Sequence, residues 1–226
     1  MILCKEAILE HYNKGNIVIE PFEMALVNPN SYDIRLGPEL YRMKGRYGQR
    51  DLYRPDDSQW EEVHPITARE IREGGMDGLP PYPQWAEGVV PDDCPVFRLE
   101  PGEFYLATTY EAIGSRPPAA GEVAIVPEMK AKSTFGRQGL TVALCAGLGD
   151  VGYCSRWALE VRLAGRSVVP LAVGTPIGQV VFHDASPTES IYGGTGHYQN
   201  EGKVRFLPKP LRWQQPDSKP NGVSHS

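Results

Sequence analysis

The chain has 226 residues and a formal net charge of −5 at pH 7, with 41% hydrophobic and 23% charged residues. This balance is that of a globular protein, and it argues against a nucleic-acid polymer as partner, because polymer binding usually needs a broad basic surface. A mononucleotide needs only a local cationic pocket. No apolar run approaches the ~20 residues of a membrane span and no signal-peptide pattern is present, so we expect a cytoplasmic protein with no membrane partner.

The length suits one domain with a sizeable core, although two small domains also fit it. We predict a single domain over residues 1–212, with an elaborated loop region at about 43–98. The tail 213–226 is polar and contains Pro and Gly, which predicts disorder. The cysteines have neither a CxxC pair nor a disulfide-framework spacing, so we expect reduced thiols at positions 4, 94, 145 and 154.

Three elements are predicted in the first part of the chain. Apolar residues at helical spacing predict a helix over residues 3–13, and residues 16–20 follow as a short strand. A turn at 28–30 then leads into a strand that places Asp33 and Arg35 on one face and apolar residues on the other. An edge-strand ion pair between Asp33 and Arg35 is the alternative to a functional role.

The loop region 43–98 is rich in Pro, Gly and charge. Residues 67–70 match a capping box that starts a short helix, which two glycines then end. Five prolines within 78–95 exclude a regular helix or central strand there. We expect large aromatic residues to act as packing anchors of this region and not as a base-stacking platform: Trp60, Tyr82 and Trp85.

Short β runs alternate with Pro and Gly turns from Val96 onward, which predicts a barrel or a jelly-roll-like sandwich. The run 157–163 alternates apolar and polar residues, so it predicts a strand with one buried face and with Glu160 on the other face. If that face lines a cleft, partial desolvation would suit the Glu160 carboxylate to proton transfer near neutral pH. The alternative is a solvent-facing glutamate that pairs with Arg162.

Residues 132–137, KSTFGR, combine a cation, two hydroxyls and a Gly-containing turn. Hydroxyls and backbone N–H groups at such a turn can bind phosphate oxygens, while Lys132 and Arg137 supply positive charge. The spacing is not that of a Walker loop, and many surface turns carry similar residues.

These motifs together resemble the dCTP deaminase family within the dUTPase-like superfamily. The matching elements, in chain order, are NSYDIRLG (30–37), KSTFGRQGL (132–140), CAGLGDVGY (145–153), Glu160, PIGQ (176–179) and YGGTGHYQ (192–199). The resemblance implies a mainly β, dUTPase-like fold, a distorted or jelly-roll-like barrel with a short N-terminal helix. It also implies a homotrimer with active sites between neighbouring subunits.

The resemblance implies catalytic roles for four residues. Glu160 falls on the general base that activates water for attack at C4 of cytosine. Ser133 and Arg137 fall on side chains that support this base, and Ala146 falls on a small residue that seats the pyrimidine. No residue falls on a protein-bound metal site.

The resemblance also implies a set of substrate-binding positions. Asp150 falls on the carboxylate that accepts the deoxyribose 3′-hydroxyl, and Tyr153 falls on the aromatic residue beneath the sugar. The remaining nucleotide-binding positions are Lys132, Thr134, Gly136, Ala158, Leu159, Gln179, Tyr192, His197, Tyr198 and Glu201.

Four positions depart from the family pattern. Ala143 and Cys145 stand near the pyrimidine pocket where His and Thr are usual. His197 and Glu201 stand where Lys and Gln are usual, and Glu201 would repel a triphosphate unless a cation intervenes. These changes concern the pyrimidine pocket and the triphosphate contacts and leave Glu160 in place.

The leading prediction is hydrolytic deamination of dCTP to dUTP and ammonia, with Glu160 favouring deamination over simple dUTP cleavage. Some family members continue to dUMP and pyrophosphate, and AGLGD and KSTFGR favour that kind. We expect Mg²⁺ to accompany the triphosphate, and we expect no zinc, because the HxE…PCxxC arrangement of zinc deaminases is absent.

Two alternatives come from the positions that depart from the family. Small side chains at Ala143 and Cys145 favour a hydrolase of dUTP or of a modified-pyrimidine deoxynucleoside triphosphate. His197 and Glu201 favour a non-catalytic, nucleotide-binding regulator.

Overall fold

A computed structural model describes residues 1–45, 51–119, 121–144, 147–186, 188, 191–192 and 207–209. The predicted disordered tail 213–226 lies outside the described residues. Within the described part of the chain, no helix has the length and apolar character to cross a membrane.

The N-terminal elements agree with the sequence pattern. Helix α1 (Lys5–Asn13) is followed by Gly15, whose positive φ of 78° turns the chain into strand β1 (Ile17–Glu20). The short 3₁₀ helix η1 (Met24–Leu26) leads into β2 (Val27–Asn28), which forms a hairpin with the first residues of β3. Ile8 of α1 and Ile17 of β1 both belong to the main hydrophobic core.

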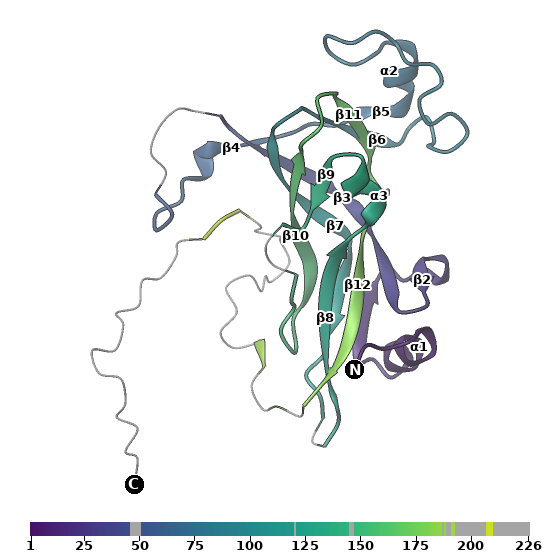
Figure 1. The fold of residues 1–226 in the computed structure, drawn as a ribbon, viewed down its shortest axis with the longest axis vertical. Coiled ribbons are helices and arrows are strands. Elements are labelled where there is room, and N and C mark those ends of the chain that lie inside the picture. Colours follow the sequence, from purple (N-terminus) through teal and green to yellow (C-terminus); the bar gives the residue numbers. More distant parts are fainter. Residues whose placement is uncertain are drawn as a thin grey trace.

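The centre of the molecule is one curled sheet of antiparallel strands in the order β8-β12-β3-β7-β10-β9 (Figure 1). The strands of this path are β3 (Ser31–Met43), β7 (Phe104–Ser115), β8 (Ala124–Ala131), β9 (Leu140–Val142), β10 (Cys154–Leu163) and β12 (Pro176–Ala185). Beside the path, β1 pairs with β7 and β2 pairs with β3 in the same sheet. The end strands β8 and β9 are joined by a single helical turn, α3 (Ser133–Arg137), so the sheet is nearly closed into a barrel. The predicted mainly β, barrel-like fold is confirmed.

The region between β3 and β7 extends beyond one end of the barrel (Figure 1). Its first part, η2 (Asp57–Gln59) and β4 (Trp60–Glu62), returns to pair with the end of β3 in the large sheet. A lobe follows that contains β5 (Ile66–Thr67), α2 (Ala68–Glu73) and β6 (Pro95–Leu99), and β6 pairs with both β5 and β11 (Val169–Ala172) in a small second sheet. The predicted capping box at the start of α2 is confirmed, and residues 80–94 form turns and irregular chain.

Two of the three aromatic residues predicted to be packing anchors of this region are buried or partly buried, and one is exposed. Trp60 is buried against Leu106 of β7, and Trp85 packs on a small cluster around Ile71, so these two predictions are confirmed. Tyr82 is 55% exposed, and its assignment as a packing anchor is wrong. Its main-chain N–H instead donates to the Ile71 carbonyl, which fixes the chain at that point without burying the ring.

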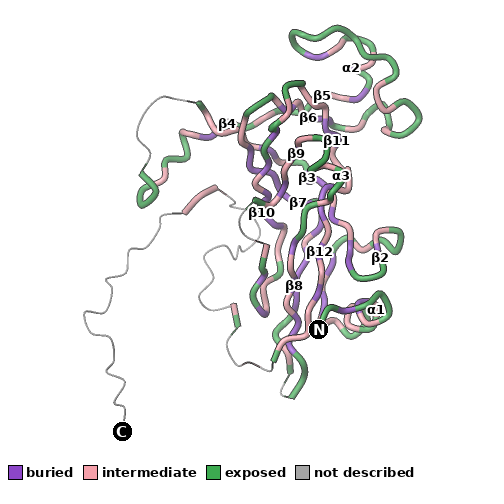
Figure 2. Tube along the Cα trace, viewed as in Figure 1, coloured by how far each residue is buried: buried purple, intermediate pink, exposed green. Residues whose placement is uncertain are grey.

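Burial alternates along the central strands, as Figure 2 shows by the purple segments within the barrel. On β3, Tyr32, Ile34 and Leu36 are buried in the main core, while Asp33 and Arg35 lie on the opposite face. This is the alternation that the sequence predicted. The polar face of β3 therefore belongs to the outer surface of the barrel.

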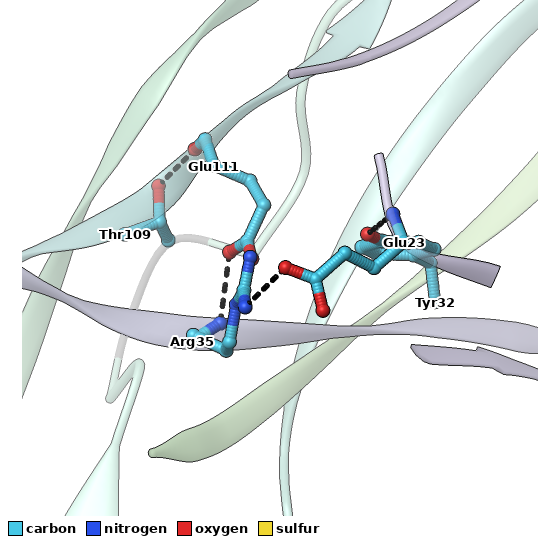
Figure 3. Close-up of polar contacts among 5 residues, drawn as sticks. All are labelled: Glu23, Tyr32, Arg35, Thr109 and Glu111. Atoms are coloured by element: carbon cyan, nitrogen blue, oxygen red, sulfur yellow. Dashed lines mark hydrogen bonds and ion pairs between the residues drawn. The ribbon is translucent and has the colours of Figure 1, made fainter. Parts of the chain in front are cut away.

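Arg35 is tied to the neighbouring strand by a buried acid (Figure 3). The Glu111 side chain of β7 is fully buried, and its carboxylate accepts hydrogen bonds from the Arg35 main-chain N–H at 2.9 Å and from Nε at 2.6 Å. Glu23 accepts from Nη1 at 2.6 Å. Burial opposes the charge of Arg35, but these hydrogen bonds outweigh it and raise the pKa of the guanidinium.

The alternative of an edge-strand ion pair between Asp33 and Arg35 is wrong. Strand β3 lies between β12 and β7, so it is not an edge strand. Arg35 pairs with Glu111 and Glu23, whereas Asp33 pairs with Lys132.

Removing the buried acid should be costly, because Arg35 would lose the partner that compensates its desolvation. We expect Glu111→Ala to lower the free energy of unfolding by about 3–5 kcal/mol, measured by urea denaturation. The matched control is Glu10→Ala, which removes an exposed surface pair with Lys14 and should leave the urea midpoint unchanged. Equal midpoints for both variants would contradict the role assigned to Glu111.

Candidate active site

Glu160 lies on the outer face of β10. Trp157, Leu159, Val161 and Leu163 are buried, while Ala158 and Arg162 are exposed and Glu160 is half-buried, so the predicted alternation is confirmed. The strand register places Glu160 opposite Leu106 of β7, a buried residue that packs with Trp60. Glu160 therefore lies beside the apolar pair Leu106 and Trp60 on the outer face of the sheet, a setting that suits a group exchanging protons with a ligand.

The main chain beside Glu160 is fixed by β9 and the residue that follows it. The Ala143 N–H donates to the Glu160 carbonyl at 3.0 Å, and Ala143 has a positive φ of 57°. A left-handed residue turns the chain sharply, so the segment leaves the sheet directly beside Glu160. Leu159 is fully buried and its side chain faces the core, so any contact of Leu159 with a ligand would involve its main chain.

A second group of predicted site residues lies in the loop that precedes β10. Asp150 is exposed, and the Tyr153 N–H donates to the Asp150 carbonyl at 2.9 Å, which closes a turn around Gly152 (φ +84°). The ring of Tyr153 packs edge-on against Trp157 at 5.2 Å and against Tyr192 at 5.3 Å. The loop thus presents an exposed carboxylate next to a group of three aromatic rings.

The hydroxyl of Tyr153 is strongly shielded from water. Burial, with a smaller contribution from Tyr192, raises the pKa of Tyr153 to about 12. The group therefore stays protonated through neutral and moderately alkaline pH, and it can act as a hydrogen-bond donor but not as a base.

The loop is held in place by a close approach to β7. Ser115 donates its main-chain N–H to the Tyr153 carbonyl at 2.9 Å, and its hydroxyl accepts from the Gly152 N–H at 3.3 Å. A Cβ on Gly114 would come within 1.9 Å of that same Tyr153 carbonyl oxygen. Only glycine fits at this position without moving the aromatic group.

The KSTFGR segment differs from the predicted turn, because Ser133–Arg137 form a helical turn with Lys132 at its N-cap. Phe135 packs against the main core, and this apolar anchor explains why the segment folds back as a helical turn and does not extend as an open loop. The remaining site candidates of this turn are exposed: Ser133, Thr134, Gly136 and Arg137. They are thus available to a ligand or to another copy of the chain.

Lys132 and Gln179 meet the polar face of β3. Lys132 Nζ forms an ion pair with Asp33 Oδ2, and Gln179 lies directly opposite Asp33 in the pairing of β12 with β3. Two residues of the β2–β3 hairpin complete this group. Asn28 Nδ2 donates to Asp33 Oδ1 at 2.9 Å, and the Ser31 hydroxyl donates to Gln179 Oε1 at 3.1 Å.

These groups lie at separate places on one chain. On β7, Leu106 lies opposite Glu160 and Thr109 lies opposite Leu36 of β3, whereas the next part of β7 pairs with β1, where Ala112 lies opposite Glu20. Glu160 and Asp33 therefore lie on different sides of β7, Glu160 on β10 and Asp33 on β3. The structure brings Lys132 and Gln179 together, and separately Asp150, Tyr153 and Tyr192, but it does not bring Lys132 next to Glu160.

Several predicted positions lie outside the described residues: Cys145, Ala146, His197, Tyr198 and Glu201. Three residues that hold other polar side chains in place were not predicted from the sequence: Asn28, which contacts Asp33, Ser31, which contacts Gln179, and Glu111, which contacts Arg35. The signal for Glu111 was present as one acid in the otherwise uncharged run of β7, ATTYEAI, where a charge needs a partner. Ser31 lies within the NSYDIRLG motif but its contact with Gln179 depends on the pairing of β12 with β3, and Asn28 carries no such signal, because polar residues next to a turn are common.

The overall architecture is shared with a solved structure. The crystal structure of 2′-deoxycytidine 5′-triphosphate deaminase from Agrobacterium tumefaciens superposes with a TM-score of 0.50 at 18% identity, over 81% of this chain and 48% of that chain. The chain therefore spans about half the length of that protein, and the likeness defines the fold class.

The sequence comparisons define the family. The family model described as dCTP deaminase-like matches residues 2–185, so the chain belongs to the dCTP deaminase-like family. A protein from Clostridium beijerinckii named "dCTP deaminase, dUMP-forming" is 30% identical over 91% of this chain and 94% of its own length. A protein of the same name from Salinispora tropica is 31% identical over 95% of this chain and 96% of its own length.

The close contact at Gly114 gives a test of how the aromatic group is positioned. We expect Gly114→Ala to destabilise the fold by about 1–3 kcal/mol and to change the near-UV circular dichroism of the Tyr153–Trp157 pair. Gly45→Ala is the matched control, because no atom lies within 4 Å of a Cβ placed there. Unchanged near-UV spectra in Gly114→Ala would mean that the loop does not depend on this contact.

Proposed function

We propose that the protein is a hydrolytic dCTP deaminase in which Glu160 is the general base. The observation that carries this proposal is the position of Glu160, a half-buried carboxylate on the outer face of β10 beside the apolar pair Leu106 and Trp60. Family membership and the names of the relatives support the same reaction. The enzyme class follows from these two supports together.

The reaction needs one water and no redox partner. Glu160 takes a proton from water, whose oxygen attacks C4 of cytosine, and the proton passes to N3 as a tetrahedral centre forms. Glu160 then carries the proton of the new C4 hydroxyl to the amine, the C4–N bond breaks, ammonia leaves, and the carbonyl of uracil remains with a proton on N3. Ser133 and Arg137 are assigned to support Glu160 and the developing charge, and Ala146 is assigned to seat the pyrimidine.

The loop before β10 is assigned to the sugar. Asp150 is exposed and can accept a hydrogen bond from the 3′-hydroxyl, while the ring of Tyr153, backed by Trp157, offers an apolar surface beneath the deoxyribose. Tyr192 packs edge-on against that ring and is assigned to the same end of the nucleotide. Ala158 and Leu159 are assigned to the strand surface that the ligand follows.

The phosphates are assigned to the exposed helical turn and the polar face of β3. Lys132 provides charge, Thr134 and Gly136 provide donors on an exposed turn, and Gln179 provides an amide. His197, Tyr198 and Glu201 are assigned to the same triphosphate. We expect the nucleotide to arrive as its Mg²⁺ complex, with the ion carried by phosphate oxygens and its charge offsetting Glu201.

A second activity is proposed for the same site. Both relatives are named dUMP-forming, and the AGLGD and KSTFGR motifs favour continuation from dUTP to dUMP and pyrophosphate. The alternative substrate, a 5-modified pyrimidine triphosphate, is favoured by the small side chain of Ala143, whose main-chain N–H donates to the Glu160 carbonyl.

We also propose that the active form is a homotrimer with shared sites. The support is the separation within one chain: Lys132 is held at Asp33 of β3, whereas Glu160 lies on β10 across β7, and the other α3 candidates are exposed. A neighbouring copy would bring its own α3 to Glu160, which a closed symmetric assembly allows.

The role of Glu160 is tested by product analysis. Purified protein is incubated with dCTP and Mg²⁺, and ammonia, dUTP, dUMP and pyrophosphate are followed together. We expect Glu160→Gln to lower kcat about 100- to 10,000-fold, because the general base is removed while the shape is kept. Glu87→Gln, in the distant lobe, is the matched control and should keep full activity. Turnover at the full rate in Glu160→Gln would contradict the mechanism.

The shared site is tested by mixing two inactive variants. Glu160→Gln and Arg137→Ala are co-expressed with different tags, and assemblies that carry both tags are purified. If each site takes Glu160 and Arg137 from different subunits, every trimer that carries both variants has one intact site in three, and activity returns to about one third of the wild-type value. Mixed assemblies that stay as inactive as either parent would contradict sites shared between subunits.

A further inference from the structure

The β2–β3 hairpin touches two of the side chains assigned to phosphate binding. Its strands are paired through Val27 with Tyr32 and Asn28 with Ser31, directly before Asp33. From this hairpin, Asp33 reaches Lys132 and Ser31 reaches Gln179. Neither Asp33 nor Ser31 has a role in the proposed reaction, so their contacts need a separate explanation.

The contact with Lys132 restricts a flexible cation. A lysine ammonium has three donors on a long, mobile stem, and an ion pair uses one donor while leaving two for phosphate oxygens. Asp33 is itself fixed, because its Oδ1 accepts from Asn28 at 2.9 Å and its side chain is only 14% exposed. A partly buried anion that is fixed in this way gives the ammonium a defined position.

The contact with Gln179 determines which end of its amide is free. Gln179 Oε1 accepts from the hydroxyl of Ser31, a residue that is almost fully buried. With the oxygen occupied, the Nε2 donors are the end of the amide that remains for a ligand. A phosphate oxygen requires donors, so the Ser31 hydroxyl selects the useful orientation of the amide.

We propose that Asp33 and Ser31 are positioning residues for the triphosphate: Asp33 holds Lys132 in place, and Ser31 orients Gln179. This inference rests on the proposed function, because it assumes that Lys132 and Gln179 face phosphate. It assigns to the polar face of the NSYDIRLG segment a role in triphosphate binding that is separate from the deamination step.

Two effects of Asp33 oppose each other, and their sizes differ. Its charge repels a triphosphate: each pair of unit charges about 6 Å apart in water amounts to about threefold in affinity, and the Mg²⁺ of the complex offsets part of this repulsion. A hydrogen bond to a charged group is larger and corresponds to about tenfold or more. We therefore expect that Asp33→Asn weakens triphosphate binding, because the lost positioning of Lys132 outweighs the removed repulsion.

The test compares steady-state kinetics of Asp33→Asn and the wild type with dCTP and Mg²⁺. KM should rise about tenfold while kcat stays within about threefold, because the chemistry at Glu160 is unchanged. The inhibition constant of inorganic tripolyphosphate should rise by the same factor as KM, since that probe has only the phosphate contacts. Ser31→Ala should shift both constants in the same direction, and Ser31→Thr, which keeps the hydroxyl, should restore them.

A double-mutant cycle separates positioning from a general structural effect. In a Lys132→Met background, Asp33→Asn should not raise KM further, because the side chain that Asp33 positions is gone. Asn30→Ala is the matched control: Asn30 lies in the same turn but donates to the Leu3 carbonyl, and its loss should leave KM unchanged. An equal KM rise for Asp33→Asn in both backgrounds would overturn the inference, as would unchanged KM and tripolyphosphate inhibition in Asp33→Asn.

The outcome also separates this inference from the proposed function. If the wild type releases no ammonia from dCTP, the deaminase proposal fails, and calorimetric binding of tripolyphosphate to the same variants still tests the positioning roles. If the wild type turns over normally and Asp33→Asn binds tripolyphosphate as tightly as the wild type does, the positioning inference alone fails.

Discussion

The contact between Arg35 and the buried Glu111 determines how β3 lies on β7, and the site depends on that register. One carboxylate accepts both a main-chain and a side-chain donor of the same residue, so it fixes the position of the strand as well as that of its side chain. A slip of one residue would turn Asp33 toward the core and bring Ile34 to the surface. Because β3 lies at the centre of the sheet, the same pair indirectly sets where Gln179 on β12 meets Asp33.

The alternation of apolar and polar residues was sufficient to predict the central strands and the outward position of Glu160, because a period of two is a local property. The capping box of α2 was readable for the same reason. The partner of Arg35 could not be predicted from the local pattern, because Glu111 is 76 positions away and only the pairing of β3 with β7 brings the two residues together. Tyr82 was misread because aromatic character alone does not say whether a loop has a surface to bury it.

The candidate site is built on two kinds of support. Glu160 lies on a long strand paired on both sides, where little movement is expected, whereas Asp150 lies on a loop held by main-chain contacts to Ser115 and a glycine that admits no side chain. Rigid strands suit a group that must meet one atom of a base, and a loop suits recognition of the sugar. The more rigid support thus carries the residue assigned to the chemistry, and the loop carries the residue assigned to recognition of the sugar.

The helical turn α3 joins the two end strands of the sheet, and it carries Phe135 toward the core while it exposes hydroxyl and cationic groups to solvent. The helical turn that joins the end strands therefore also carries residues of the proposed ligand site. A ligand that binds only the closed form adds its binding free energy to the closure of the barrel. The nucleotide would in that sense act as a folding cofactor, and a cell depleted of it would contain a looser, more protease-sensitive population of the same chain.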